Sequence, residues 1–408
     1  MSEPMTPTVD PAYQGLFRRY LDVALRAALA DLKGDTVTVD EGKRQQVWHL
    51  LSYGLGVAES WPHVRELLLA LAPKMEQAGF RTEWLGYLET GLVQSRSLAD
   101  RRAEAELTLQ VGYLHLRLRQ LDQAKAQLTA ARDLFIELDD LVGQCAAINR
   151  LAAAVRYAGD MAQARSLLSY TLSVLPEESE EWGYSHFGAA LLYRELLDLD
   201  TAAYHLEQCL AVSTRYGNRR QMGLCVLNMG LIFFEQKAYA QAVEHSLAAA
   251  TIFEEIDGLQ DLATAKMNAG IGYSQLGQVD TALTLYAQAE LLFHRLHDPV
   301  SLAMIHCNQG IAYRQLTRPA EAIQAFQAGI LLWDQVGNLK RRINLVSGLG
   351  KAQMDLGQFD QAIATLTAGL AELEAAGPDG PTDGQYARLV DVLNRDIALA
   401  QRKERSLD

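Results

Sequence analysis

Cysteine is scarce in this sequence and is not arranged for metal binding or disulfide formation. The 408 residues include four cysteines, Cys145, Cys209, Cys225 and Cys307, and no C-x-x-C pair. Each cysteine lies inside a helical pattern. We therefore expect four reduced, buried thiols, as is usual for a cytoplasmic protein.

Proline and long apolar runs are also lacking. There are only 10 prolines, while Ala and Leu are plentiful, and this balance favours helix over strand. No apolar run has the length of a membrane-spanning helix. The first ten residues contain neither the charged segment nor the apolar segment of a secretory signal. The chain is therefore expected to be soluble and cytoplasmic.

Positive charge is in the minority. The formal net charge is −13, and an acidic chain repels nucleic-acid phosphates and anionic membrane surfaces. We expect neither a nucleic acid nor a membrane as partner, although a local basic patch can overrule the average.

Catalytic motifs are absent as well. Gly42-Lys43 is followed by Arg44, with no glycine five residues upstream, so it is not a phosphate-binding loop. No G-x-S-x-G or H-E-x-x-H motif occurs. His294 and His297 are one helical turn apart, but no acidic or thiol ligand completes a metal set. The sequence predicts no metal, no cofactor and no enzyme.

A repeat of about 40 residues is present instead, and internal repeats of this length indicate stacked helical hairpins. Small residues expected in the first helix of each repeat are Gly112, Ala152, Ala190, Gly230, Gly270, Gly310 and Gly350. Twelve residues later the second helix has Ala124, Ala164, Ala202, Ala242, Ala282, Ala322 and Ala362. The step between the second and third repeats is two residues shorter than the others.

The spacing has a packing explanation. Two antiparallel helices approach closely only where side chains are small, and bulky residues follow at helical spacing. Tyr286 and Phe326, for example, come four residues after the alanine of their repeats. Gly159, Gly277 and Gly357 fall between the two helices, where a left-handed residue ends the first helix.

This pattern resembles the tetratricopeptide repeat (TPR), although the period is longer than is usual for that repeat. It is similar to that of kinesin light chains, the Leu-Gly-Asn-rich (LGN-like) adaptors, Rap-type peptide receptors and the C-terminal halves of bacterial signalling ATPases. The resemblance implies an all-α fold: a right-handed α-solenoid of TPR-type helical hairpins with an N-terminal helical bundle and a C-terminal capping helix.

The ends of the chain depart from the repeat. Trp84 occupies the alanine position of a divergent first repeat, and Gly377 to Gly384 is rich in helix breakers. The predicted organisation is a disordered tail (1–11), N-terminal helices (12–60), a divergent capping repeat (61–99), seven TPR-like repeats (100–375), a linker (376–384) and a capping helix (385–404). A docking arm is the alternative for the last helix.

The first helix of each repeat is expected to line a concave groove. With the small residue counted as position 8, position 6 is Asn228, Asn268 and Asn308 in three successive repeats. Asparagine is a poor choice in mid-helix, and its amide can pair with a peptide backbone. In the adaptors that the chain resembles, asparagines here clamp an extended ligand. Bonding to the neighbouring repeat is the alternative.

Arginines and one aromatic residue complete the predicted peptide-binding set. These residues are Arg117, Arg150, Arg156, Arg194, Phe234 and Arg314. Arginine binds carboxylates through two parallel hydrogen bonds, so the expected ligand offers an acidic segment or a C-terminal carboxylate. Pairing with groove acids such as Glu195 and Glu235 is the alternative.

Two functions follow from these patterns. The first is a protein-interaction module or scaffold that binds a peptide or partner protein in the groove. The second is a peptide-responsive regulatory receptor, resembling the Rap type, or a sensor component of a bacterial signalling system. Exposed repeat ends can stack, so self-association stays open.

Overall fold

The computed structural model describes residues 11–32, 41–77, 79–378 and 384–405 of the chain. Over these ranges it contains nineteen α-helices and one short 3₁₀ turn, and no strand. The all-α prediction is confirmed. Most of the predicted N-terminal tail and residues 379–383 of the predicted linker lie outside the described residues. Of the helices that are described, none is long and apolar enough to cross a membrane.

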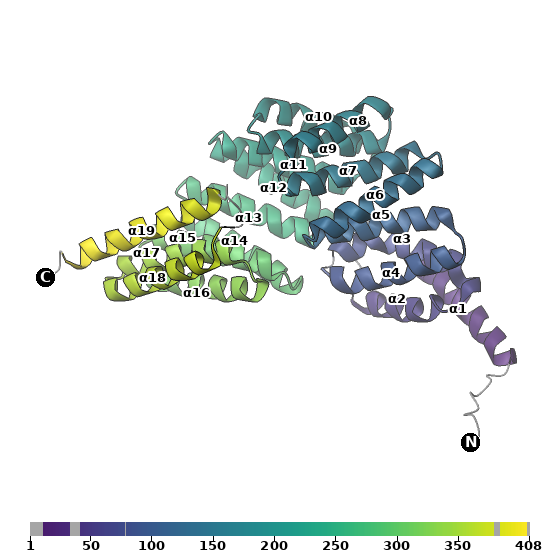
Figure 1. The fold of residues 1–408 in the computed structure, drawn as a ribbon, viewed down its shortest axis with the longest axis horizontal. Helices are drawn as coiled ribbons and strands as arrows, with labels where there is room; N and C mark the ends of the chain where they lie inside the picture. The colour runs from purple at the N-terminus through teal and green to yellow at the C-terminus, as the bar shows by residue number, and fades with distance from the viewer. Residues whose placement is uncertain (1–10, 33–40, 78, 379–383, 406–408) are drawn as a thin grey trace, which may run out of the picture. The chain divides into compact units, whose positions relative to one another are not determined.

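The chain divides into two compact units. Unit 1 comprises residues 1–232 and 252–259, and unit 2 comprises residues 233–251 and 260–408. Figure 1 shows that consecutive helices within each unit are arranged as stacked hairpins. Stacking of this kind lets each hairpin bury its apolar faces against its neighbours.

Unit 1 begins with a helical bundle and continues with hairpins. Its helices are α1 (Pro11–Asp31), α2 (Glu41–Gly54), η1 (Ala58–Ser60), α3 (Trp61–Gln77), α4 (Arg81–Ser97), α5 (Arg101–Arg117), α6 (Leu121–Glu137), α7 (Leu141–Tyr157), α8 (Met161–Val174), α9 (Glu180–Glu195), α10 (Leu199–Tyr216) and most of α11 (Arg219–Glu235).

Unit 2 contains the later hairpins and the last helix. Its helices are most of α12 (Tyr239–Glu255), α13 (Leu259–Gln275), α14 (Val279–Arg295), α15 (Pro299–Gln315), α16 (Pro319–Val336), α17 (Leu339–Asp355), α18 (Phe359–Ala376) and α19 (Gly384–Glu404).

Each repeat consists of two helices, and a short turn follows each helix. Most of these helices are equal in length and end at a turn that contains one residue with positive φ. The predicted turn glycines have φ values of +91° at Gly159, +77° at Gly277 and +81° at Gly357. Glycine adopts this left-handed conformation without steric cost, which explains its place there.

The one shortened step in the repeat series has a local cause. Helix α8 has only 14 residues, and its C-cap Leu175 is extended, with ψ of 142°. Pro176 follows, and proline favours an extended conformation in the residue before it. The second hairpin of the repeat series therefore ends early.

Small and large residues pack as the repeat predicts. A Cβ atom added to Gly112, Gly270, Gly310 or Gly350 would lie 2.6–2.8 Å from the bulky residue sixteen positions later. Those bulky residues are Leu128, Tyr286, Phe326 and Leu366. The seven alanines of the second helices are buried, with at most 4% of their surface exposed. The two helices of a hairpin thus touch across glycine and alanine.

The two chain ends cover the first and last hairpins. In the N-terminal bundle, Leu25 of α1, Leu51 of α2 and Trp84 of α4 belong to one fully buried core. At the other end, α19 packs on α17 and α18 and buries Leu389 and Leu393. A terminal helix of this kind shields the apolar face of the last hairpin.

Candidate functional site

The first helices of the unit 2 repeats present a row of accessible residues. On α13 and α15, positions 2, 6 and 9 are half-buried or exposed, and on α13 the residues between them are mostly buried. We call these residues the unit 2 stripe: Thr264, Asn268, Ile271, Met304, Asn308 and Ile311. Their spacing of four and then three places them on one face of each helix.

The two asparagines of the unit 2 stripe have unused hydrogen-bonding capacity. Asn268 and Asn308 are both half-buried, and within the described residues neither side-chain amide has a hydrogen-bond partner. Each amide offers donors and an acceptor. The aliphatic residues Ile271 and Ile311 lie one turn further along, and Ile311 is 45% exposed. The stripe therefore combines free amides with apolar surface.

Asn228, in unit 1, has a different environment. It is only 8% exposed, and its Nδ2 donates to the carbonyl of Leu224 over 2.8 Å. Its Oδ1 accepts a hydrogen bond from Nη1 of Arg194 over 2.9 Å. The bond joins α9 to α11, so at this position the amide ties two successive repeats together.

Arg156 is held within the protein. It is 6% exposed and forms an ion pair with Glu195, one repeat further along. Its guanidinium also lies over the ring of Tyr157, 4.4 Å from the centroid. Pairing of a groove arginine with Glu195, which the sequence left open as an alternative, is therefore present in the structure as the Arg156–Glu195 ion pair.

Arg150 and Arg117 are more accessible. Arg150 is half-buried, donates to the carbonyl of Ala146 over 2.9 Å and lies 5.5 Å from the ring centroid of Tyr113. Its Nε atom is buried without a hydrogen-bond partner. Arg117 is exposed at the end of α5.

The last two predicted residues lie in unit 2. Nε of Arg314 donates to Oδ2 of Asp355 over 2.7 Å, which links α15 to α17. Phe234 is half-buried, with its ring 5.3 Å from that of Tyr239. The predicted set is therefore distributed over both units, and only parts of it lie together.

Sequence reasoning missed a buried polar network between α7 and α9. Asn149 donates to Oε1 of Glu181 over 2.7 Å and to Oγ of Ser185 over 2.9 Å, and accepts from Thr171. Burial raises the pKa of Glu181, and the nearby charge of Arg150 opposes that shift. The available signal was the pair Glu181 and Ser185, spaced one turn apart on an otherwise apolar helix face.

A buried histidine pair was also missed. The Nδ1 atoms of His186 and His205 lie 2.7 Å apart, within reach of Trp182 and Tyr193. Burial, reinforced by His205, lowers the pKa of His186 to about 4, and burial also lowers the pKa of His205. Beside this pair is a cavity of about 390 Å³ that Arg165 and His205 help to line.

The described residues offer little for catalysis or metal binding. No group of three His, Cys, Asp or Glu side chains in the described ranges could hold a metal ion. Burial raises the pKa of the Cys307 thiol to about 11, which disfavours the nucleophilic thiolate at neutral pH. The neighbouring His306 instead lies 2.9 Å from Oε1 of Gln309.

Comparisons with known proteins agree with this architecture. A family model described as tetratricopeptide repeat matches residues 261–330, which include the unit 2 stripe. No curated protein matches the sequence.

Several solved structures share the fold. The Cut9–Hcn1 hetero-tetramer of the APC/C has a TM-score of 0.59 at 16% identity, covering 91% of this chain and 63% of that chain. A STAND protein with a tetratricopeptide repeat sensor from Pyrococcus horikoshii also has a TM-score of 0.59, at 12% identity, covering 89% and 55%. A Rap protein complexed with competence and sporulation factor has a TM-score of 0.53 at 12% identity, covering 86% and 100%.

This chain therefore spans less than two thirds of the first two of these proteins. At such identities the likeness concerns the fold. Together with the long internal repeat and its packing of glycine against bulky residues, these matches show that the chain has the fold of a tetratricopeptide-repeat solenoid, in which residues 261–330 match the tetratricopeptide repeat.

Proposed function

We propose that this protein is an interaction scaffold that binds an extended peptide segment of a partner protein on the unit 2 stripe. One observation carries the proposal. Asn268 and Asn308 occupy the same position in successive repeats, are half-buried, and have no hydrogen-bond partner in the described part of the chain. Asparagine lowers helix stability, so two unbonded asparagines in mid-helix are better explained by a ligand than by the fold.

The geometry suits an extended ligand. Oγ of Ser274 donates to Oε1 of Gln315 over 2.7 Å, so α13 and α15 lie side by side at the end of this face. A peptide backbone offers donors and acceptors whatever its side chains are, and the two amides can pair with it. Ile271 and Ile311 would contact apolar side chains of the same ligand.

The arginines fit an acidic ligand to different degrees. Arg156 and Arg194 already contact Glu195 and Asn228, so an incoming carboxylate would have to compete with these bonds. Arg117 and Arg150 are more accessible. We include them as contacts for acidic side chains of a ligand on unit 1, because guanidinium groups pair with carboxylates.

A peptide-responsive receptor is the second candidate. The Rap protein in complex with competence and sporulation factor is covered over its full length by this chain, with a TM-score above 0.5. In this function the peptide would change the accessibility of the N-terminal bundle, α1 to α4, whereas a scaffold would leave the bundle unchanged. Hydrogen exchange of α1 to α4 with and without ligand separates the two functions.

The test compares partners of three proteins in a lysate of the source cell. Wild type is compared with Asn268→Ala/Asn308→Ala and with the control Asn394→Ala. Asn394 lies on α19, outside the repeats and the unit 2 stripe, and is exposed. We expect the double variant to lose at least one partner that wild type and the control retain.

Two further readouts complete the test. The double variant must keep the circular dichroism and melting temperature of wild type. The retained partner should slow hydrogen exchange in α13 and α15. Equal retention by all three proteins would exclude the unit 2 stripe as the binding surface.

A further inference from the structure

Helix α1 has two apolar faces, and only one of them is used within the chain. The inner face packs in the N-terminal bundle through Leu21, Leu25 and Ala28, which are at most 7% exposed. The outer face carries Tyr13, Leu16, Tyr20, Val23, Ala27 and Ala30. We call these six residues the α1 stripe. The four larger ones are 49–68% exposed.

The spacing of the α1 stripe is that of a coiled-coil seam. Successive members are three, four, three, four and three residues apart. This alternation keeps a narrow row of side chains facing a second helix along its whole length. Tyr13, Tyr20 and Ala27 take the a positions of the heptad, and the other three take the d positions. The opposite side of the helix already faces the bundle, so the seam is directed outward.

Side-chain size changes along the α1 stripe in one direction. The bulky Tyr13 and Leu16 lie at the start of the helix, and the small Ala27 and Ala30 lie at its end. In two antiparallel copies, each a residue lies opposite a d residue. Tyr13 then meets Ala30, Leu16 meets Ala27, and Tyr20 meets Val23. Every layer combines a larger with a smaller side chain, so no layer places two tyrosines or two alanines against each other.

A parallel pair would not pack in this way. Tyr13 would meet Tyr13 at one end and Ala30 would meet Ala30 at the other. The helices would then be held apart at the tyrosines, and the alanines would lose contact. The order of sizes therefore favours an antiparallel, two-fold symmetric arrangement, the kind in which one surface is complementary to itself.

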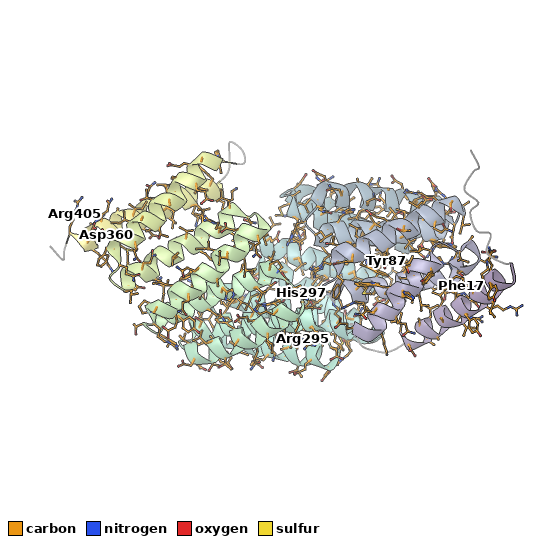
Figure 2. The ribbon with its side chains drawn as sticks, turned by 90° about the horizontal axis from the view of Figure 1, so that it is seen from below. Phe17, Tyr87, Arg295, His297, Asp360 and Arg405 are labelled. Atoms are coloured by element: carbon orange, nitrogen blue, oxygen red, sulfur yellow. The ribbon has the colours of Figure 1, made fainter. Side chains whose placement is uncertain are left out.

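We propose that the α1 stripe is a homodimer contact, in which α1 of one copy packs antiparallel against α1 of a second copy. The Phe17 ring is 45% exposed and lies 5.7 Å from that of Tyr53, at the edge of the seam. Figure 2 labels Phe17 on α1. In the antiparallel pair Phe17 would face Ala24 of the second copy, another pairing of a large with a small residue.

The charges beside the α1 stripe and its exposed area determine how strongly the two copies are expected to associate. Arg18 is paired with Glu59, and Arg26 with Asp22, within the same copy. Arg19 would approach Arg26 of the second copy, so like charges weaken the contact and added salt should strengthen it. The exposed surface of the α1 stripe is on the order of 600 Å² per copy. This is below the roughly 800 Å² per partner of a standard interface, which indicates a weak, concentration-dependent dimer.

The first experiment is sedimentation equilibrium of the full chain over a wide concentration range. The variants are Tyr20→Glu at the centre of the seam and Val93→Glu as the control. Val93 is 65% exposed on α4 of the same bundle but is not part of the seam. We expect wild type and Val93→Glu to dimerise with equal affinity, and Tyr20→Glu to weaken the dimer at least tenfold. A wild-type monomer at all concentrations, or a dimer that Tyr20→Glu leaves intact, would overturn the proposal.

A second experiment tests the antiparallel register. In a Cys307→Ser background, Tyr13→Cys and Ala30→Cys proteins are mixed and treated with a short bismaleimide. We expect cross-linked dimers in the mixture and not in either protein alone. Cross-linking of Tyr13→Cys with itself would indicate the parallel arrangement and contradict the proposal. Both readouts are independent of peptide binding on the unit 2 stripe, so the two proposals can fail separately.

Discussion

Gly270 of α13 packs directly against the ring of Tyr286 on α14. A Cβ atom at Gly270 would lie 2.6 Å from Cε1 of the tyrosine, closer than such atoms approach in proteins. Tyr286 is 2% exposed, so its ring has no room to move away. The hairpin is held together by the fit of a ring into the space that a missing side chain leaves.

Replacing this glycine should therefore destabilise unit 2. We expect Gly270→Ala to lower the free energy of unfolding by about 1–3 kcal/mol, because the added methyl group overpacks the contact. Gly86→Ala on α4 is the control, since nothing lies within 4 Å of its Cβ position. Alanine is the better helix former, so the control should be neutral or stabilising by up to about 1 kcal/mol. Urea unfolding measures both, and equal effects would contradict the packing explanation.

This contact also shows how much of the fold could be predicted from the sequence. The regular repeat spacing identified Gly270 as a small residue and Tyr286 as a bulky residue of the same repeat, and the structure adds that the two are in direct contact. The shortened α8 appeared only as one irregular step in that spacing, and its early end at Leu175 depends on the backbone of one loop.

The candidate site was less predictable. Position 6 gave three equivalent asparagines, yet Asn228 bonds to Arg194 while Asn268 and Asn308 have no bond in the described residues. The residue 34 positions earlier, in the preceding repeat, is Arg194 for Asn228 but Phe234 for Asn268 and Ser274 for Asn308, and only the arginine bonds to its asparagine. The pair His186 and His205 was missed because it joins residues outside the repeated positions.

The three asparagines should consequently differ in their effect on stability. Asn228→Ala removes one acceptor of Arg194 in a largely buried place, and we expect a loss of about 1–2 kcal/mol. Asn268→Ala and Asn308→Ala remove no bond, and alanine favours helix, so these variants should be at least as stable as wild type. Thermal unfolding of the three single variants measures this. A similar loss in all three would mean that Asn268 and Asn308 also support the fold.

The contact between α19 and the last repeat should stabilise unit 2. Oδ2 of Asp396 accepts a hydrogen bond from Ser347 over 2.7 Å and lies 3.0 Å from Nζ of Lys351, while Leu393 is fully buried. We expect Leu393→Ala to cost about 2–5 kcal/mol through the cavity it leaves.

Asp396→Ala should cost less, about 1–3 kcal/mol, because Lys351 is 34% exposed and can turn to water. In both variants, faster hydrogen exchange in α17 and α18 would report the local loss of stability. Unchanged exchange in Leu393→Ala would show that α19 does not cap the repeat in solution.

The pair His186 and His205 should make stability depend on pH. Burial, reinforced by His205, lowers the pKa of His186 from the ordinary 6.5 to about 4. The unfolded chain therefore takes up a proton near pH 6.5, and the folded chain only near pH 4. The contribution of this histidine to stability is complete above pH 6.5 and is lost as the pH falls towards 4.

We expect the loss to be about 1–3 kcal/mol, because one pKa unit corresponds to about 1.4 kcal/mol. His186→Asn keeps an amide donor beside His205 but does not titrate, so its unfolding free energy should fall less between pH 7 and pH 4.5. His297→Asn is the control: His297 is exposed at a turn with φ of +48°, a conformation that asparagine tolerates. This control should follow the wild-type curve. If His186→Asn follows it too, protonation of the buried pair does not govern acid unfolding.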